Sequence, residues 1–103
     1  MTTKILVVVF YSFLFIFHSL LLIADKYNIK GLVQFCEEEL SQNLRLDNAL
    51  QILELYEKVE ADHLMAETLA FVANNRRSLI GTDKWRKVVS SNPKILEEII
   101  RLS

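Results

Sequence analysis

Three side chains in this sequence could take part in metal or thiol chemistry, and they lie far apart along the chain. They are His18, Cys36 and His63. A closed zinc site needs about four nitrogen, sulfur or carboxylate ligands that the fold brings together. Because each of the three residues stands alone in the sequence, we expect neither a metal site nor a cofactor.

Asp62 and His63 are of the types that hydrolases pair, an acid beside a base. Adjacent residues on one helix point about 100° apart, so these two side chains do not face each other. Cys36 has no Lys, Arg or His near it in the sequence that would lower its pKa. We expect Cys36 to be a small buried apolar group. The sequence therefore offers no candidate catalytic residues.

Charge is nearly balanced in this chain, with 12 basic and 13 acidic side chains and a net charge of −1 at pH 7. A mild basic cluster around Trp85 consists of Arg76, Arg77, Lys84, Arg86 and Lys87. The overall balance gives no electrostatic reason to expect a nucleic-acid partner. The single cysteine cannot form an intramolecular disulfide, which excludes a disulfide-stabilised scaffold.

Apolar residues are concentrated at the start of the chain. Of the 20 residues of Ile5–Ala24, 17 are apolar, and Lys4 is the only charged residue before Asp25. As a helix this run is about 30 Å long, the thickness of a bilayer core. Three interpretations are open. The run is a membrane span, a signal peptide that lacks a small-x-small cleavage site, or a segment whose last part is a core helix of a soluble fold.

After this leader, apolar residues recur at helical spacing, and no run alternates as a strand would. The expected helices lie near 29–42, 46–58 and 61–74, after Thr82, and from Pro93 onward. Only two glycines and one proline are present, which argues against β-sandwiches and barrels. The predicted fold is all-α, a small bundle of about five to six short helices preceded by a long apolar N-terminal helix.

Local signals mark several helix ends. Thr82 and Asn92 can each cap a helix N-terminus, and Pro93 follows Asn92 where its missing N–H costs nothing. Asn74-Asn75 is expected to stop a helix, since Asn tolerates the left-handed conformation of a C-cap. The apolar stripes predict inward-facing side chains that include Leu46, Tyr56, Phe71, Leu96 and Ile100.

Five short motifs follow one another along the body of the chain. They are LLLIADKY at 20–27, NIKGL at 28–32, CEEEL at 36–40, NLRLDNA at 43–49, and WRKVV at 85–89 followed by Asn92-Pro93. In this order they resemble the late helices of a BTB (POZ) domain, the helix pair called the 3-box, and the start of a BACK segment. Their spacing is most similar to that of the speckle-type POZ proteins of the MATH–BTB family.

The resemblance covers about residues 19–100 and divides the chain into three parts. These are an apolar leader (1–18), the C-terminal helices of a truncated BTB domain (19–44) and 3-box/BACK-like helices (45–103). Neither the MATH domain nor the strands of the BTB domain have a counterpart in this sequence. Arg45 and Glu60 stand where the family often has a capping Ser, and each lost cap is expected to destabilise its helix by about 1 kcal/mol.

The resemblance implies an interaction protein that is not an enzyme, in agreement with the lack of candidate catalytic residues. Members of the family are substrate receptors of cullin-3 ubiquitin ligases, in which the BTB domain dimerises and holds the cullin while the 3-box extends the cullin-binding surface. The implied partner is cullin-3, self-association is the other implied interaction, and the implied location is the cytoplasm or the nucleus. The residues that we expect to contact the cullin are Leu44, Asn48, Ile52, Leu55 and Tyr56.

The alternative is a small single-pass membrane protein, anchored by Ile5–Ala24, with a cytosolic helical domain. The segment Leu20–Tyr27 distinguishes the two interpretations, because a helix that packs in a soluble core cannot also lie in lipid. We favour the interaction protein, since the apolar run ends inside a family motif whose soluble packing accounts for its last five apolar residues.

Overall fold

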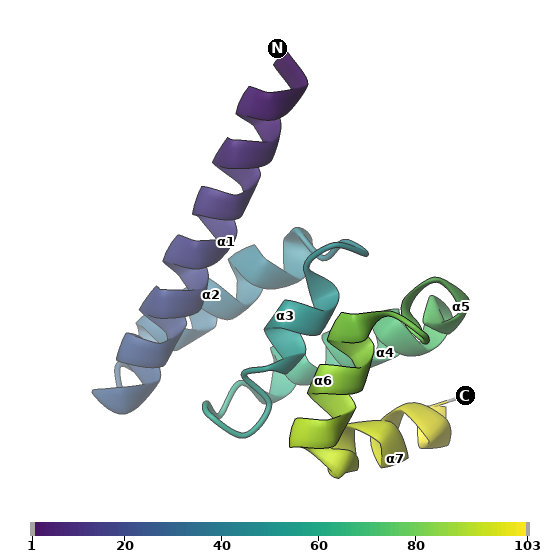
Figure 1. Cartoon of the computed structure of the whole chain (residues 1–103). Coiled ribbons are helices and arrows are strands. Elements are labelled where there is room, and N and C mark those ends of the chain that lie inside the picture. The colour runs from purple at the N-terminus through teal and green to yellow at the C-terminus, as the bar shows by residue number, and fades with distance from the viewer. Residues whose placement is uncertain (1, 103) are drawn as a thin grey trace.

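The computed structural model describes residues 2–102, with the side chains of residues 14–102. All of the described secondary structure is helical, which confirms the predicted all-α class. The helices are α1 (Thr2–Lys26), α2 (Lys30–Gln42), α3 (Ala49–Leu53), α4 (Asp62–Asn74), α5 (Arg76–Leu79), α6 (Asp83–Ser91) and α7 (Pro93–Leu102). Helices α1 and α2 contact each other on one flank, α4, α6 and α7 form the other, and α3 lies between them (Figure 1).

The C-terminal half of α1 is part of the bundle. Leu14, Leu21 and Ala24 on this half are buried, and Leu21 and Ala24 have no exposed surface. The start of α1 extends beyond the other helices (purple in Figure 1). The chain then turns at the expected break, where Asn28 has φ 58° and the Ile29 N–H donates to the Ala24 carbonyl at 2.9 Å.

Within the part of the chain that the structure describes, no helix is both long and apolar enough to cross a membrane. Residues 5–13 of the run Ile5–Ala24 lie outside the residues whose side chains are described.

Two of the predicted helix starts are confirmed by their caps. The Trp85 N–H donates to Oγ1 of Thr82 at 3.2 Å, and the Lys94 N–H donates to Oδ1 of Asn92 at 3.2 Å. Each side chain thereby satisfies a backbone donor that the first helical turn leaves without a partner. Gly81, directly before Thr82, has φ 100°, a conformation that favours glycine.

Helix α4 ends at Asn74 as expected, but the prediction that its C-cap adopts the left-handed conformation is wrong. Asn75 has φ −117°. Its side-chain amide donates to the Phe71 carbonyl at 2.8 Å. The Phe71 carbonyl thereby has a second donor besides the backbone N–H of Asn75 at 3.1 Å. The chain then continues into the short helix α5 instead of reversing.

The prediction of a single helix over 46–58 is also wrong, because the only α-helix in this range, α3, has five residues. After α3, the Leu55 N–H donates to the Ile52 carbonyl at 3.0 Å and the Lys58 N–H to the Leu55 carbonyl at 2.9 Å. Such i→i+3 bonds give about three residues per turn, so residues three apart point the same way. Ile52 and Leu55 are both completely buried as a result.

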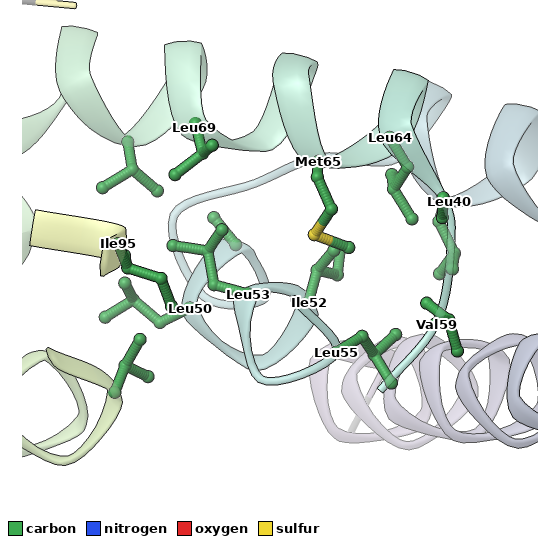
Figure 2. Close-up of a cluster of buried hydrophobic side chains, with 14 of the residues drawn as sticks. Leu40, Leu50, Ile52, Leu53, Leu55, Val59, Leu64, Met65, Leu69 and Ile95 are labelled. Atoms are coloured by element: carbon green, nitrogen blue, oxygen red, sulfur yellow. The ribbon is translucent and has the colours of Figure 1, made fainter. Parts of the chain in front are cut away.

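The core surrounds α3. Met65 points from α4 toward Ile52 and Leu55, while Ile95 of α7 lies beside Leu50 (Figure 2). Several stripe residues expected to face inward are instead exposed; these are Leu46, Leu96 and Ile100. On α7 only Ile95 and Ile99 are buried, because the helix contacts α4 and α6 along one narrow side.

Candidate protein-interaction surface

The structure separates the five residues predicted to contact a partner into two groups. Asn48, Ile52 and Leu55 are buried, with 2% or less of their surface exposed. Leu44 and Tyr56 are half-buried and pack against the edge of the core. In this arrangement a partner can reach Leu44, before α3, and Tyr56, after it, but not the three residues between them.

Asn48 holds the loop between α2 and α3. Its Oδ1 accepts from the Arg45 N–H at 2.8 Å, and its Nδ2 donates to the Asn43 carbonyl at 2.7 Å. A buried amide with both ends hydrogen-bonded fixes the backbone around it. Asn48 therefore positions Leu44, which lies inside the loop that it braces.

Two carboxylates position the segment between α3 and α4 that carries Tyr56. Oε2 of Glu37 on α2 accepts from the Leu64 N–H at 3.0 Å, in the first turn of α4. Oδ1 of Asp25 on α1 accepts from the Glu60 N–H at 3.1 Å. The N-cap residue of α4 is Ala61, whose side chain makes no capping hydrogen bond. The carboxylates on α1 and α2 thus take over the role of the missing Ser cap near Glu60.

Tyr56 lines two adjacent grooves. The first groove, of about 460 Å³, lies between the end of α3 and the α6–α7 corner; its lining is Leu53, Glu54, Tyr56, Glu57, Lys58, Lys87, Val88, Ser91, Asn92 and Ile95. The second groove, of about 420 Å³, lies between α4 and α7; its lining is Tyr56, Val59, Asp62, Met65, Ala66, Leu69, Glu98 and Leu102. The first turn of α7 carries Ile95 of the first groove and its end carries Leu102 of the second. Figure 1 shows α7 running below α6 and α4.

The second groove is the more apolar of the two in residue type. Val59, Met65 and Leu69 form buried parts of its wall, while Ala66 and Leu102 are exposed. An apolar groove of this size between helices suits apolar side chains of a partner protein. Local sequence patterns did not reveal it, because its two walls come from helices that are far apart in the chain.

His18 lies at a third opening, between α1 and α3, together with Leu14, Phe15, Gln51 and Glu54. Burial lowers the pKa of His18 from its ordinary value of 6.5. The nearby Glu54 opposes this shift, and the positive charges of Lys58 and Lys84 add to it. The neutral imidazole is therefore favoured in the folded chain.

The other residues considered for chemistry are separate from one another. Cys36 is fully buried, and burial raises the pKa of its thiol. His63 is exposed and contacts Glu67, one helical turn away, at 2.9 Å. Among the described residues no three His, Cys, Asp or Glu side chains are grouped so that they could hold a metal ion.

Comparison with curated proteins relates the chain to BTB/POZ proteins. It is 32% identical over 73 residues to TD and POZ domain-containing protein 5 of Mus musculus, covering 71% of this chain and 22% of that protein. It is 34% identical over 85 residues to a BTB/POZ domain-containing protein of Arabidopsis thaliana, covering 82% of this chain and 38% of that protein.

A third relative is protein maternal effect lethal 26 of Caenorhabditis elegans, 26% identical over 81 residues, which are 79% of this chain and 20% of that protein. The chain thus spans less than two fifths of the length of each of these relatives. No protein-family model matches the chain, and no solved structure matches it. The similarities support a BTB/POZ-like region in this chain.

Proposed function

We propose that this chain is a protein-interaction module, and not an enzyme, that binds cullin-3 through Tyr56 and the second groove. In this proposal residues 19–44 correspond to the end of a BTB domain, 45–74 to the 3-box and the following helices to the start of BACK, as in the speckle-type POZ proteins. The module works in the cytoplasm or the nucleus, where it would occupy the cullin as adaptor subunits of cullin-3 ubiquitin ligases do.

Tyr56 is the observation that carries this proposal. It is a predicted contact residue that is accessible and that lines both grooves. Tyrosine is enriched among residues that dominate binding energy, because its ring buries a large area while its hydroxyl keeps a polar partner. The similarity to BTB/POZ proteins supports a protein partner.

The exposed apolar side chains near the α1–α2 junction support the second implied interaction, self-association. They are Ile23, Tyr27, Ile29 and Phe35. The burial of Leu21 and Ala24 favours the interaction module over the membrane anchor, because these side chains cannot both fill the core and face lipid.

A pull-down of the whole chain on immobilised cullin-3 tests the proposal. The most informative variant is Ala66→Arg, which places a long charged side chain in the second groove from an exposed position on α4. Arginine is a good helix former, so the helix should persist. We expect Ala66→Arg and Tyr56→Glu to reduce cullin-3 capture at least tenfold, by roughly 1.4 kcal/mol of binding free energy.

Asn74→Arg is the matched control, because Asn74 is exposed on the same helix and lines neither groove. It should bind like the unmodified chain. Circular dichroism must show that all the variants keep their helical content. Full capture by a folded Ala66→Arg chain would exclude the second groove, and no capture by any folded chain would exclude cullin-3 itself.

A further inference from the structure

Asn92 on the wall of the first groove has a buried hydrogen-bond donor without an acceptor. Only 9% of the residue is exposed. Its Oδ1 caps α7 by accepting from the Lys94 N–H at 3.2 Å, and this bond fixes the orientation of the amide. Its Nδ2 has no acceptor among the described residues. Buried polar groups are nearly always paired, and an unpaired one calls for an explanation.

The charges around this amide favour an anionic acceptor. Glu54 forms an ion pair with Lys84. Of the other charged residues in the lining, Lys58 and Lys87 are positive and Glu57 is negative. The start of α7 adds the partial positive charge of a helix N-terminus beside Asn92. The donor of Asn92, the two ammonium groups and the helix N-terminus thus outweigh Glu57, the one carboxylate of this lining that has no ion pair among the described residues.

The remainder of the lining is apolar. Leu53, Val88 and Ile95 are buried side chains that the groove reaches, and Tyr56 stands at the boundary with the second groove. The groove volume of about 460 Å³ lies within the range of pockets that hold small ligands or short peptide segments. The occupant must therefore combine an acceptor with apolar surface.

We propose that the first groove binds a peptide segment of a partner protein in which an acidic side chain lies between apolar ones. The carboxylate accepts from Nδ2 of Asn92 and is flanked by Lys58 and Lys87. The neighbouring apolar side chains contact Tyr56, Val88 and Ile95. This site shares Tyr56 with the proposed cullin-3 contact, but Asn92, Lys58 and Lys87 line the first groove and not the second, and its test does not involve cullin-3.

Titration of the ¹⁵N-labelled whole chain with acetyl-Ala-Leu-Glu-Leu-Ala-amide, followed by NMR, tests this site. The side-chain NH₂ resonances of Asn92 should shift saturably, with a dissociation constant of about 1 mM or tighter. The peptide with Gln in place of Glu presents a neutral acceptor of nearly the same shape. It should bind about tenfold more weakly, because hydrogen bonds to charged groups are the stronger ones.

Asn92→Ser is the sharpest variant, since Ser can still cap α7 while the unpaired donor is removed. We expect this change to weaken binding of the acidic peptide about tenfold. The NMR spectrum of the variant should remain that of a folded chain. The pair Lys58→Gln and Lys87→Gln should weaken binding and reduce its salt dependence. Its control is the pair Lys26→Gln and Lys30→Gln, which changes the net charge equally on residues outside both grooves.

Four results would overturn the proposal. They are the absence of shifts at Asn92, equal affinity for the two peptides, unchanged binding by Asn92→Ser, and shifts confined to the second groove. None of them bears on whether cullin-3 binds, so the two proposals can fail independently.

Discussion

The carboxylate of Glu37 accepts a hydrogen bond from the Leu64 N–H at 3.0 Å, across 27 positions of sequence. Leu64 lies in the first turn of α4, where backbone N–H groups have no partner within the helix. A negative charge there also complements the partial positive charge of the helix N-terminus. A residue of α2 thus caps α4 and ties α2 to the end of the segment that carries Tyr56.

Replacing Glu37 by Ala should destabilise the chain by about 1 kcal/mol, the usual effect of losing a helix cap. Glu37→Gln retains an oxygen acceptor but not the charge, so it should destabilise the chain less than Glu37→Ala does. Urea unfolding followed by circular dichroism at 222 nm measures the free energy of unfolding of both variants. Glu38→Ala, at an exposed position of the same helix, is the control. A Glu37→Ala chain as stable as Glu38→Ala would show that this cap contributes nothing.

Asn48 is the second polar residue on which the fold depends. Asn48→Ala removes the two bonds to Arg45 and Asn43 and leaves a small cavity, so we expect a loss of about 2 kcal/mol. Asn74→Ala, at an exposed position, should change stability by less than about 0.5 kcal/mol. The same urea experiment compares them. Equal stability of the two variants would contradict the bracing of the α2–α3 loop by Asn48.

The depressed pKa of His18 predicts a pH dependence of folding. The unfolded chain takes up a proton near pH 6.5, while the folded chain does so at a lower pH because its imidazole is desolvated. The unfolded state therefore binds more protons below about pH 6.5, and the free energy of unfolding should fall as pH drops from about 7 to 5.

Two variants isolate this contribution from that of the carboxylates. His18→Gln should flatten the dependence of stability on pH between about 7 and 5. Gln34→Ala, at an exposed position without a titratable group, should leave that dependence unchanged. Chemical unfolding at several pH values gives the slopes. Identical slopes for the two variants would contradict the depressed pKa of His18.

Burial of Cys36 predicts an unreactive thiol. The side chain has no exposed surface, and its raised pKa leaves little thiolate at neutral pH. Ellman's reagent should give no rapid colour with the folded chain and one thiol per chain in denaturant. Rapid reaction of the native chain would mean that α2 opens readily or that its inner face is not covered.

Signals confined to a few neighbouring residues predicted their part of the fold well. Thr82 and Asn92 begin α6 and α7 because their caps bond to residues within the next three positions. The sequence around Ile52 was misleading, since its apolar residues fit an α-helix while the chain forms i→i+3 turns after Leu53. Those turns are explained by burial of Leu55 and Val59, which depends on helices distant in sequence.

The candidate site was only partly predictable for the same reason. The resemblance indicated Tyr56 and Leu44, but it gave no means of separating them from the buried Ile52 and Leu55. The Glu37 cap connects residues 27 positions apart, and the wall of the second groove combines α4 with α7. No local pattern records such contacts, so the grooves became visible only when the helices were assembled.

Isothermal titration calorimetry of the whole chain against cullin-3 measures the proposed interaction itself. Binding should be saturable with a negative heat-capacity change, the mark of apolar surface buried in the second groove. Tyr56→Glu should lower the affinity by about 2 kcal/mol, roughly 30-fold. The absence of saturable heat from a chain shown to be folded would contradict the proposed interaction.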